Sequence, residues 1–540
     1  MTGSFDRTDK SLSTEERVRL AVLDCGASII ATTLTTAAAF WLGMTSTVPA
    51  IRGFYIYAGP CVLIDFLYQV TFFIALISIN ERRIHEDRQD CCICFKNPSM
   101  NQNDEYQDDP FSRIVMRKYG YFLSNSKVFQ VMVIASKFYP HCDRTNEFLR
   151  STVVCSIIKV FTGLTVFLGH RCTKLKVNFD TTDVLASDSF VLSFVKASNQ
   201  YSDTEPYHTR VFFRDIDFSD PAMRLEMTHY VSELVDLKYV QIKPNFWVED
   251  FENFVKEKGQ SQLHFEEQID LFLDNDLFKK HYSDQIIRTK EGQVIASTVL
   301  LALHNIDIDA ARSQVNFLFA QRKVSSNQVI NKKSKRWAFF TFTDFYYIWE
   351  FFAVATKELI MTTILGIAAV VVFSFLFIPH PSGFLFIAPT VIMIYADVLG
   401  VMHLCGLTIN PVTYISLIMS IGLMVDYVFH IVLRYFESQE LTRKGKVVDV
   451  LSTMGVSILI GGISTILGSV PLSFSQSEIF FSVFIVFFSF VVLSLAHGLL
   501  FVPVVLSLCG PVGETANEIL FMSNVRKDTG STDELETIDY

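Results

Sequence analysis

The sequence predicts a polytopic α-helical membrane protein of about eight spans with one α+β domain outside the membrane. Three observations support this. Half of the 540 residues are hydrophobic, and 50 are Phe, which is more than a soluble domain of this size carries. Several apolar runs reach the roughly 20 residues that a helix needs to cross a bilayer. A long polar stretch, 169–356, separates one group of these runs from the other.

The N-terminal part predicts three spans. Residues 1–21 are polar and are expected to be cytosolic, and the apolar runs 22–44 and 53–79 follow. The loop 80–148 is also expected in the cytosol. It contains Cys91, Cys92 and Cys94, which could be palmitoylated, bind zinc or be ordinary loop cysteines. Without a second cysteine cluster we expect no metal site. The weaker apolar run 149–168 predicts the third span.

Residues 169–356 predict a mixed α+β domain. Val211 to Phe213 has the composition of a strand, and Ser219-Asp220-Pro221 predicts a helix start with proline in the first turn. Residues 285–304 predict two strands that turn at Lys290-Glu291-Gly292. Further helices are expected at 247–258, 265–273 and 308–322, and a strand at 337–342. Such alternation is typical of a ferredoxin-like layer.

Residues 357–510 predict five closely spaced spans, at 359–378, 384–404, 412–436, 450–470 and 479–508. The loop 434–446 is the most basic of their connections and is therefore expected in the cytosol. Counting spans from this loop places both termini in the cytosol and the 169–356 domain on the extracellular or lumenal side. The acidic tail, 511–540, is expected to be disordered.

An acidic residue interrupts the apolar run Val412 to Phe436. Asp426 lies in its middle, and His430 follows one helical turn later. A charged side chain at this depth costs roughly 2.5 to 3.5 kcal/mol on insertion scales, so it usually faces the interior of a helix bundle and marks an ion path. A purely structural, hydrogen-bonded carboxylate is the alternative. Asp397 and His497 also lie in apolar spans, where we expect structural roles.

An internal repeat links the two groups of spans. Gly26 to Thr36 (GASIIATTLTT) aligns without a gap with Gly455 to Thr465 (GVSILIGGIST). Each segment opens one span and is followed by a second of similar length, so the first two spans repeat the last two. Repeats of this kind are typical of large transporters.

Four segments together resemble Patched domain-containing proteins of the resistance-nodulation-division (RND) superfamily. Ile51 to Phe73, followed by Arg82-Arg83, is similar to the end of a Patched-type sterol-sensing domain, and Gly422 to His430 to the matching helix of the second half. Leu175 to Tyr201 and the Trp247 to Phe251 helix are similar to the second extracellular domain. The resemblance covers nearly all of residues 15–510 and implies an RND-type bundle.

The resemblance also implies roles for individual residues. It places Asp426 and Tyr427 at an intramembrane ion relay, where His430 could share a proton and Gly422 could allow close packing or movement. Residues 22–79 correspond to the C-terminal part of the sterol-sensing domain, with candidate residues Tyr57, Asp65, Tyr68 and Gln69. Asp65 and Gln69 could equally be polar contacts between helices. The family has twelve spans, of which this chain matches five to twelve, so an N-terminal truncation is expected.

The function expected from these features is transport of sterol or another lipid, driven by a proton or sodium gradient through Asp426. The alternatives are a non-transporting sterol-sensing receptor and an inactive fragment. No Walker loop, nucleophile elbow or His-Glu-x-x-His motif occurs, and we expect neither an enzyme nor a cofactor. The net charge of −10 does not favour nucleic-acid binding. A homo-oligomer is possible.

Overall fold

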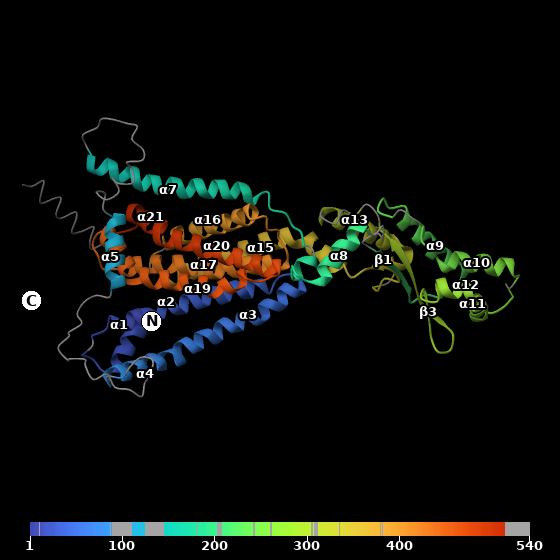
Figure 1. Cartoon of the computed structure of the whole chain (residues 1–540), viewed down its shortest axis with the longest axis horizontal. Coiled ribbons are helices and arrows are strands. Elements are labelled where there is room, and N and C mark those ends of the chain that lie inside the picture. Colours follow the sequence, from blue (N-terminus) through green and yellow to red (C-terminus); the bar gives the residue numbers. More distant parts are fainter. Residues whose placement is uncertain are drawn as a thin grey trace, which may run out of the picture. The chain divides into compact units, whose positions relative to one another are not determined.

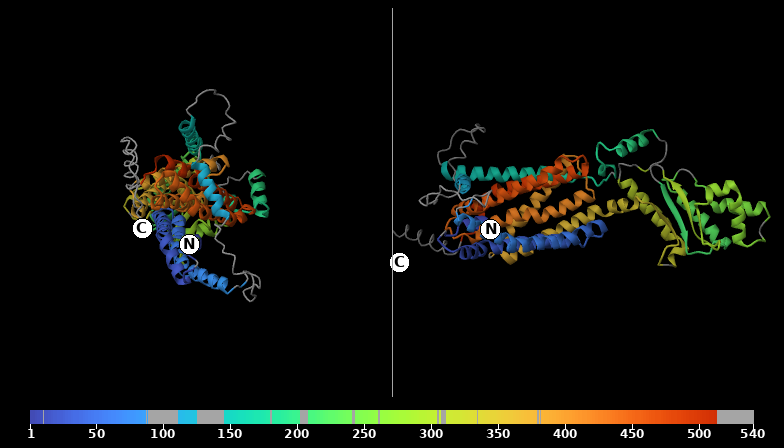
Figure 2. Two further views of the ribbon diagram at one scale, coloured as in Figure 1. Left: turned by 90° about the vertical axis from the view of Figure 1, so that its left-hand side faces the viewer. Right: turned by 60° about the horizontal axis from the view of Figure 1, so that its bottom comes forward.

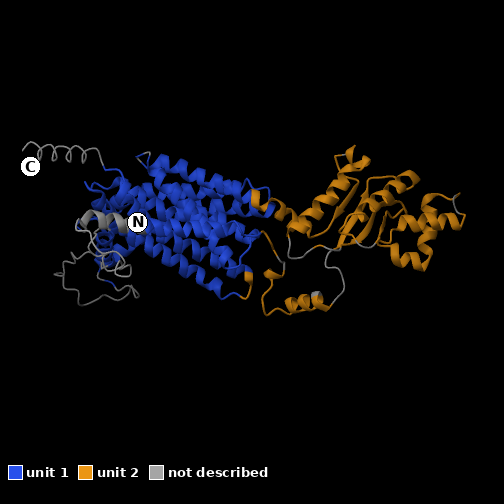
Figure 3. Cartoon of the chain, turned by 90° about the horizontal axis from the view of Figure 1, so that it is seen from above, with its two compact units in different colours: residues 1–176, 358–475, 479–540 blue, residues 177–357, 476–478 orange. Residues whose placement is uncertain are grey.

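A computed structural model describes residues 1–9, 11–86, 88, 111–124, 145–179, 181–201, 208–240, 243–259, 262–303, 306, 311–333, 335–378, 380 and 382–512. The cysteines at 91, 92 and 94 and the tail beyond 512 lie outside these residues. The chain forms two compact units, coloured separately in Figure 3. Unit 1 comprises residues 1–176, 358–475 and 479–540, and unit 2 comprises residues 177–357 and 476–478.

Unit 1 is a helix bundle. In the described part of the chain, seven helices are long and apolar enough to cross a membrane. They are α2 (Thr14–Gly43), α3–η1–α4 (Pro49–Tyr68, Gln69–Phe73, Ile74–His85), α15 (Tyr346–Phe377), α16 (Gly383–Leu404), α17 (Pro411–Glu437), α18–η4–α19 (Arg443–Val450, Leu451–Gly455, Val456–Ser473) and α20–η5–α21 (Glu478–Ala496, His497–Phe501, Val502–Cys509). The segment expected to form a third span lies in another helix, α7 (Thr145–Cys172). These helices confirm the prediction of a polytopic helical membrane protein.

Helix α17 lies inside this bundle. It contacts α2, α3, α16, α18 and α21 along its length, and more of its apolar stretch is buried than in any other of the seven spans. Figures 1 and 2 show α2 and α3 beside it on one side of the bundle. Two shorter helices, α1 (Thr2–Asp6) and α5 (Phe111–Ser124), pack at the ends of the spans.

Helix α7 packs closely along α16 because a glycine lies at the contact. A methyl group on Gly400 would overlap the backbone carbonyl and the Cβ of Leu168. Phe161, Thr165 and Leu168 recur at helical spacing on α7, and each is turned toward the bundle. The small residue therefore sets the distance between the two helices, as is common where helices associate in lipid.

We expect Gly400→Ala to destabilise the bundle by about 1 to 3 kcal/mol, the usual cost of overpacking, because the methyl group meets backbone rather than a movable side-chain end. Reversible unfolding in mixed micelles measures this. Gly468→Ala is the matched control, since a methyl group there meets nothing within 4 Å. Equal unfolding free energies for the two variants would contradict the close contact.

Unit 2 contains a four-stranded antiparallel sheet of order β2-β3-β1-β4. Its strands are β1 (His208–Arg214), β2 (Ile286–Arg288), β3 (Val294–Ala302) and β4 (Phe339–Phe342). Helices α9 (Pro221–Val235), α10 (Trp247–Glu257), α11 (Phe265–Asp274) and α12 (Asp276–Tyr282) connect β1 to β2, and α13 (Ala311–Asn327) and α14 (Val329–Lys332) connect β3 to β4. Thus β-α-β-β-α-β order confirms the predicted ferredoxin-like layer. Helices η3 (Thr181–Val184) and α8 (Phe190–Tyr201) precede it.

The sequence signals within unit 2 are also confirmed. The Asp220 side chain accepts from the backbone N–H of Ala222 and caps α9, with Pro221 in the first turn. Gly292 has a φ of +90° in the turn between β2 and β3, a conformation that few other residues adopt.

The core of unit 2 is aromatic. Phe213, Tyr230, Trp247, Phe251 and Phe339 are fully buried in it. The indole of Trp247 donates a hydrogen bond of 2.6 Å to the buried Ser297 hydroxyl of β3, so its polar atom is satisfied.

Candidate functional site

Helix α17 carries Asp426 into the bundle. The helix begins with a capping box: the Asn410 side chain accepts from the backbone of Val412 and Thr413, and the Thr413 hydroxyl accepts from the backbone N–H of Asn410. Pro411 occupies the first turn, where its missing N–H has no cost. The helix then runs 27 residues without a break. Asp426 therefore lies in the middle of a well-capped helix inside the bundle.

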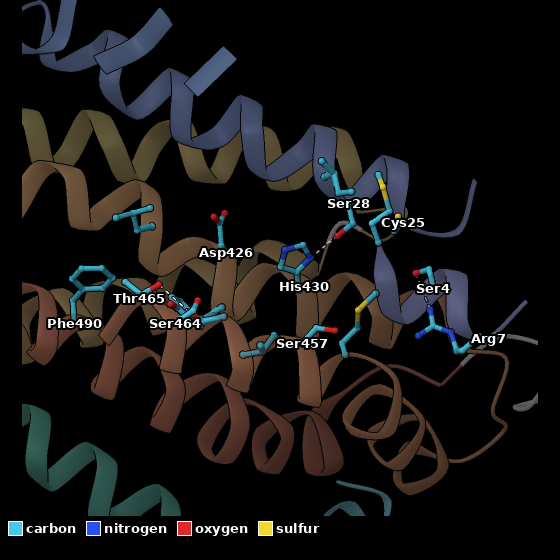
Figure 4. A pocket seen from close by; sticks show the side chains of 17 residues that line it. Ser4, Arg7, Cys25, Ser28, Asp426, His430, Ser457, Ser464, Thr465 and Phe490 are labelled. Carbon is cyan, nitrogen blue, oxygen red and sulfur yellow. Dashed lines mark hydrogen bonds between the residues drawn. The ribbon is translucent and has the colours of Figure 1, made fainter. Parts of the chain in front are cut away.

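Asp426 lines a cavity of about 440 Å³. The cavity lies between α1, α2, α17 and α19, and Phe490 of α20 closes part of it. Figure 4 shows Asp426 and His430 on one helix, with Cys25 and Ser28 on one side and Ser457, Ser464 and Thr465 on the other. The lining mixes hydroxyl groups with apolar side chains and also includes Arg7 of α1.

The carboxyl group of Asp426 is incompletely paired. Its Oδ1 atom is buried and makes no hydrogen bond. A buried carboxylate without partners is costly, so such a group either takes up a proton or binds a cation. A functional role for Asp426 and a purely structural one both remain predictions, and this unpaired oxygen is the observation that favours the functional one.

His430 contacts α2 rather than Asp426. Its Nδ1 lies 2.5 Å from the hydroxyl oxygen of Ser28, and which of the two donates depends on the ring tautomer. Both His430 and Asp426 line the cavity, one helical turn apart. The hydrogen bond to Ser28 thus holds the imidazole at the edge of the space that Asp426 faces. Sharing of a proton between the two remains a prediction.

Tyr427 and Gly422 play different parts in the packing. Tyr427 lines the cavity, and its side chain interacts with that of Thr465 on α19. Gly422 is outside the cavity lining and lies where α2 crosses α17. A methyl group there would come within 3.2 Å of the Thr36 side chain and 3.3 Å of its Cα. Gly422 therefore lets α2 approach α17 closely.

The four candidate residues of the sterol-sensing segment lie elsewhere, on α3 and η1. Tyr57 and Tyr68 are 77% and 62% exposed. Asp65 is also exposed, Gln69 is half-buried, and the Gln69 amide donates a 2.9 Å hydrogen bond to the Asp65 carboxylate. The most apolar part of this span has no buried residue. The structure therefore does not bring these residues together with Asp426.

Several cavity residues were not singled out from the sequence, although the internal repeat carries the signal. Ser28 and Ile29 of the first copy align with Ser457 and Ile458 of the second, and all four line the cavity. The two copies thus contribute equivalent positions on opposite sides of Asp426.

Comparisons with known proteins agree with this architecture. A sequence model described as the sterol-sensing domain of SREBP cleavage-activation matches residues 1–97. NPC1-like intracellular cholesterol transporter 1 of Rattus norvegicus is 24% identical over 90% of this chain and 39% of its own length. Patched-related protein 9 of Caenorhabditis elegans is 25% identical over 95% of this chain and 57% of its own length. The chain is a homologue of the NPC1-like and Patched-related proteins.

The fold has a solved counterpart. The cryo-EM structure of the hedgehog release protein Disp from the water bear Hypsibius dujardini superimposes with a TM-score of 0.59 at 16% identity, covering 92% of this chain and 59% of that one. This likeness shows that the two chains share a fold. The chain spans about half the length of the curated relatives that it matches. With its apolar helices and these homologues, the protein is a multi-pass integral membrane protein.

Proposed function

We propose that this NPC1-like and Patched-related homologue moves sterol or another lipid, and that an ion gradient drives the movement through Asp426. The observation that carries the proposal is the unpaired carboxyl oxygen of Asp426 in a cavity inside the bundle. A group in this position has two states of different charge. Binding of a proton or a cation neutralises it, and release restores a charge that the apolar surroundings disfavour.

The lipid part of the proposal is supported by the relatives. Two of them are named cholesterol transporters, from Rattus norvegicus and Sus scrofa, and the first 97 residues match the sterol-sensing domain. The exposed aromatic residues Tyr57 and Tyr68 on α3 are available to contact lipid directly. Asp65 and Gln69 add polar atoms that could hold a hydroxyl headgroup beside these rings.

The surroundings of Asp426 suit a switch between two charge states. Hydroxyl groups of Ser457, Ser464 and Thr465 border the same cavity and can donate to a carboxylate or accept from a protonated one. Na⁺ is a hard cation, and hard cations are bound in proteins by oxygen ligands such as these hydroxyl and carboxylate groups. The coupling ion is therefore a proton or sodium, and the two need separate tests.

Reconstitution of the whole chain in liposomes tests the proposal. Transfer of a fluorescent sterol between vesicle populations is followed with no gradient, with a pH gradient and with a sodium gradient of equal size. Acceleration by one gradient alone supports transport and identifies the ion. A dissipating ionophore must remove the acceleration, because any direct effect of pH on the vesicles would survive it.

The sterol-sensing match favours one rival function, a receptor that binds sterol without moving it. Saturable binding of a photoreactive sterol, together with transfer rates that no gradient changes, would support that rival against transport. Absence of both binding and transfer in a correctly folded chain would instead identify an inactive portion of a longer transporter.

A further inference from the structure

A second pair of titratable side chains lies inside the bundle, apart from the Asp426 cavity. Asp397 of α16 and His497 of η5 are both fully buried, with 0% of their surface exposed. Neither lines the cavity described above. They approach each other across the bundle, with His497 Nε2 3.7 Å from Asp397 Oδ2.

Each of the two side chains has one partner and one unsatisfied atom. Asp397 Oδ2 accepts a hydrogen bond of 3.3 Å from the Thr165 hydroxyl of α7, and His497 Nδ1 lies 2.8 Å from the backbone carbonyl of Leu493. Asp397 Oδ1 and His497 Nε2 make no hydrogen bond. An unpaired polar atom on each of two neighbouring side chains at zero exposure is unusual in a folded protein.

The partner of Nδ1 determines the tautomer of the ring. A carbonyl oxygen only accepts, so Nδ1 must carry a hydrogen. In the neutral imidazole, Nε2 is then an acceptor and its lone pair is directed toward the carboxyl group. If Asp397 were ionised as well, two acceptors would face each other without a hydrogen between them, and the pair would carry an uncompensated negative charge in an apolar place.

One bound proton removes both problems. With the proton on Asp397 the carboxyl donates to Nε2, and with the proton on His497 the imidazolium donates to the carboxylate. In either state the pair is neutral overall. The two atoms need to close by roughly 1 Å to reach the distance of a charge-assisted hydrogen bond.

No other charge competes for this proton within the described residues. The recorded ion pairs of Asp397 and His497 are with each other alone. The rings of Phe161 and Phe501 pack against the imidazole at centroid distances of 4.8 and 5.6 Å. Titratable groups on the neighbouring elements have other positions or partners. They include Tyr119 of α5, which donates to the Leu499 carbonyl, Lys159 of α7, which is exposed, and Asp426, Tyr427 and His430 of α17, which line the other cavity. The hydroxyls of Tyr395 of α16 and of Tyr414 and Tyr435 of α17 are hydrogen-bonded to Thr363, Thr362 and the Leu506 carbonyl.

We propose that Asp397 and His497 together form a second proton-binding site of the membrane bundle, in which one proton is held between Oδ2 and Nε2. A metal ion fits poorly, because one carboxyl, one hydroxyl and one imidazole offer only a single anionic ligand. The site lies at a π-helical turn, η5, and such turns frequently occur at functional positions. The proposal rests on this geometry and does not require lipid transport.

The pH dependence of unfolding tests the site in the whole chain. Above about pH 7 an unfolded chain has an ionised Asp and a neutral His, so it binds no proton at these residues, whereas the folded pair binds one. Stability from this pair therefore falls as pH rises, and the unfolding constant should increase tenfold per pH unit for as long as the pair keeps its proton. Asp397→Asn should lose this tenfold dependence. Asp65→Asn, the same change at an exposed carboxyl, should keep it.

Infrared spectroscopy gives a second readout. The full chain in nanodiscs should show the carbonyl band of a protonated or strongly hydrogen-bonded carboxyl group that Asp397→Asn removes and His497→Gln shifts. Thr165→Val keeps the side-chain shape but removes the hydroxyl that donates to Oδ2, so it should shift the same band. This variant serves as the test should Asp397→Asn not fold. Unchanged bands in both His497→Gln and Thr165→Val, or a wild-type pH slope in Asp397→Asn, would overturn the proposal.

Discussion

Replacing Asp426 with asparagine is expected to abolish gradient-driven lipid transfer while leaving the protein folded. Asparagine has nearly the same shape but can neither release a proton nor neutralise a cation, so the switch between charge states is lost. Movement of one charge through a driving force equivalent to 100 mV is worth about 2.3 kcal/mol, which sets up at most a roughly 50-fold gradient of substrate. Asp426→Asn should therefore reduce lipid accumulation from up to about 50-fold to none, measured in the liposome assay under an imposed gradient.

Asp65→Asn is the matched control for this prediction. It makes the same chemical change in another membrane span, at a carboxyl that is exposed and hydrogen-bonded to Gln69 rather than enclosed in the cavity. Because Asp65 is proposed to contact the lipid headgroup and not the coupling ion, this variant should bind lipid more weakly but should keep an accumulation that depends on the gradient. Should Asp426→Asn accumulate lipid as well as the wild type, another group must couple the ion, and Asp426 would be a structural residue after all.

Apolar length and one charge that is costly in lipid were enough to predict helix α17 and the burial of its middle in the bundle. A run of more than 20 apolar residues that crosses a membrane forms a helix, because its backbone groups must be hydrogen-bonded within the segment. The free-energy cost of Asp426 in lipid then favours a position inside the bundle for this helix. The residues around the carboxyl were harder to predict. Ser28 and Ser457 are ordinary small residues in apolar helices, and only the pairing of α2 and α19 around α17 makes them neighbours of Asp426.

The Asp397 and His497 pair shows the same limit more sharply. Each residue alone suggests a structural role in an apolar span, as expected from the sequence. The two residues are 100 positions apart in the sequence and come together only because α16 and η5 pack against each other. Helix α7 then supplies the Thr165 hydroxyl. Periodicity within one helix carries no information on such a three-helix contact.

In unit 2 the sequence predicted the strands and most helix ends, because capping and turn signals are local. It gave no indication of Asn331, which lies in the short helix α14 before β4. Its side chain is buried and fully used: the amide donates to the carbonyls of Ser325 and Phe339 at 2.7 and 2.6 Å, and its oxygen accepts from the N–H groups of Ala338 and Phe339 at 2.8 and 3.1 Å. A single residue thus joins the end of α13 to the start of β4.

Asn331→Ala is expected to destabilise unit 2 by about 4 kcal/mol. The substitution removes four hydrogen bonds to the backbone. The Ser325 carbonyl still accepts from the Gln328 N–H, so at most three buried backbone groups lose their partner, and each costs roughly 1 to 3 kcal/mol before the structure relaxes. Hydrogen exchange of the β1 and β4 amides in the full chain measures the loss directly, because these strands pair with each other through Val211 and Thr341.

Asn327→Ala is the control, the same substitution at an exposed position four residues earlier on α13. Asn327→Ala should change the opening free energy measured by hydrogen exchange by no more than the roughly 0.5 kcal/mol typical of surface substitutions. If the β4 amides were as well protected from hydrogen exchange in Asn331→Ala as in this control, water would have to replace all four hydrogen bonds of the Asn331 side chain. That result would mean that the α14–β4 connection opens to solvent at little cost, and the aromatic packing of Phe339 alone would then hold the edge of the sheet.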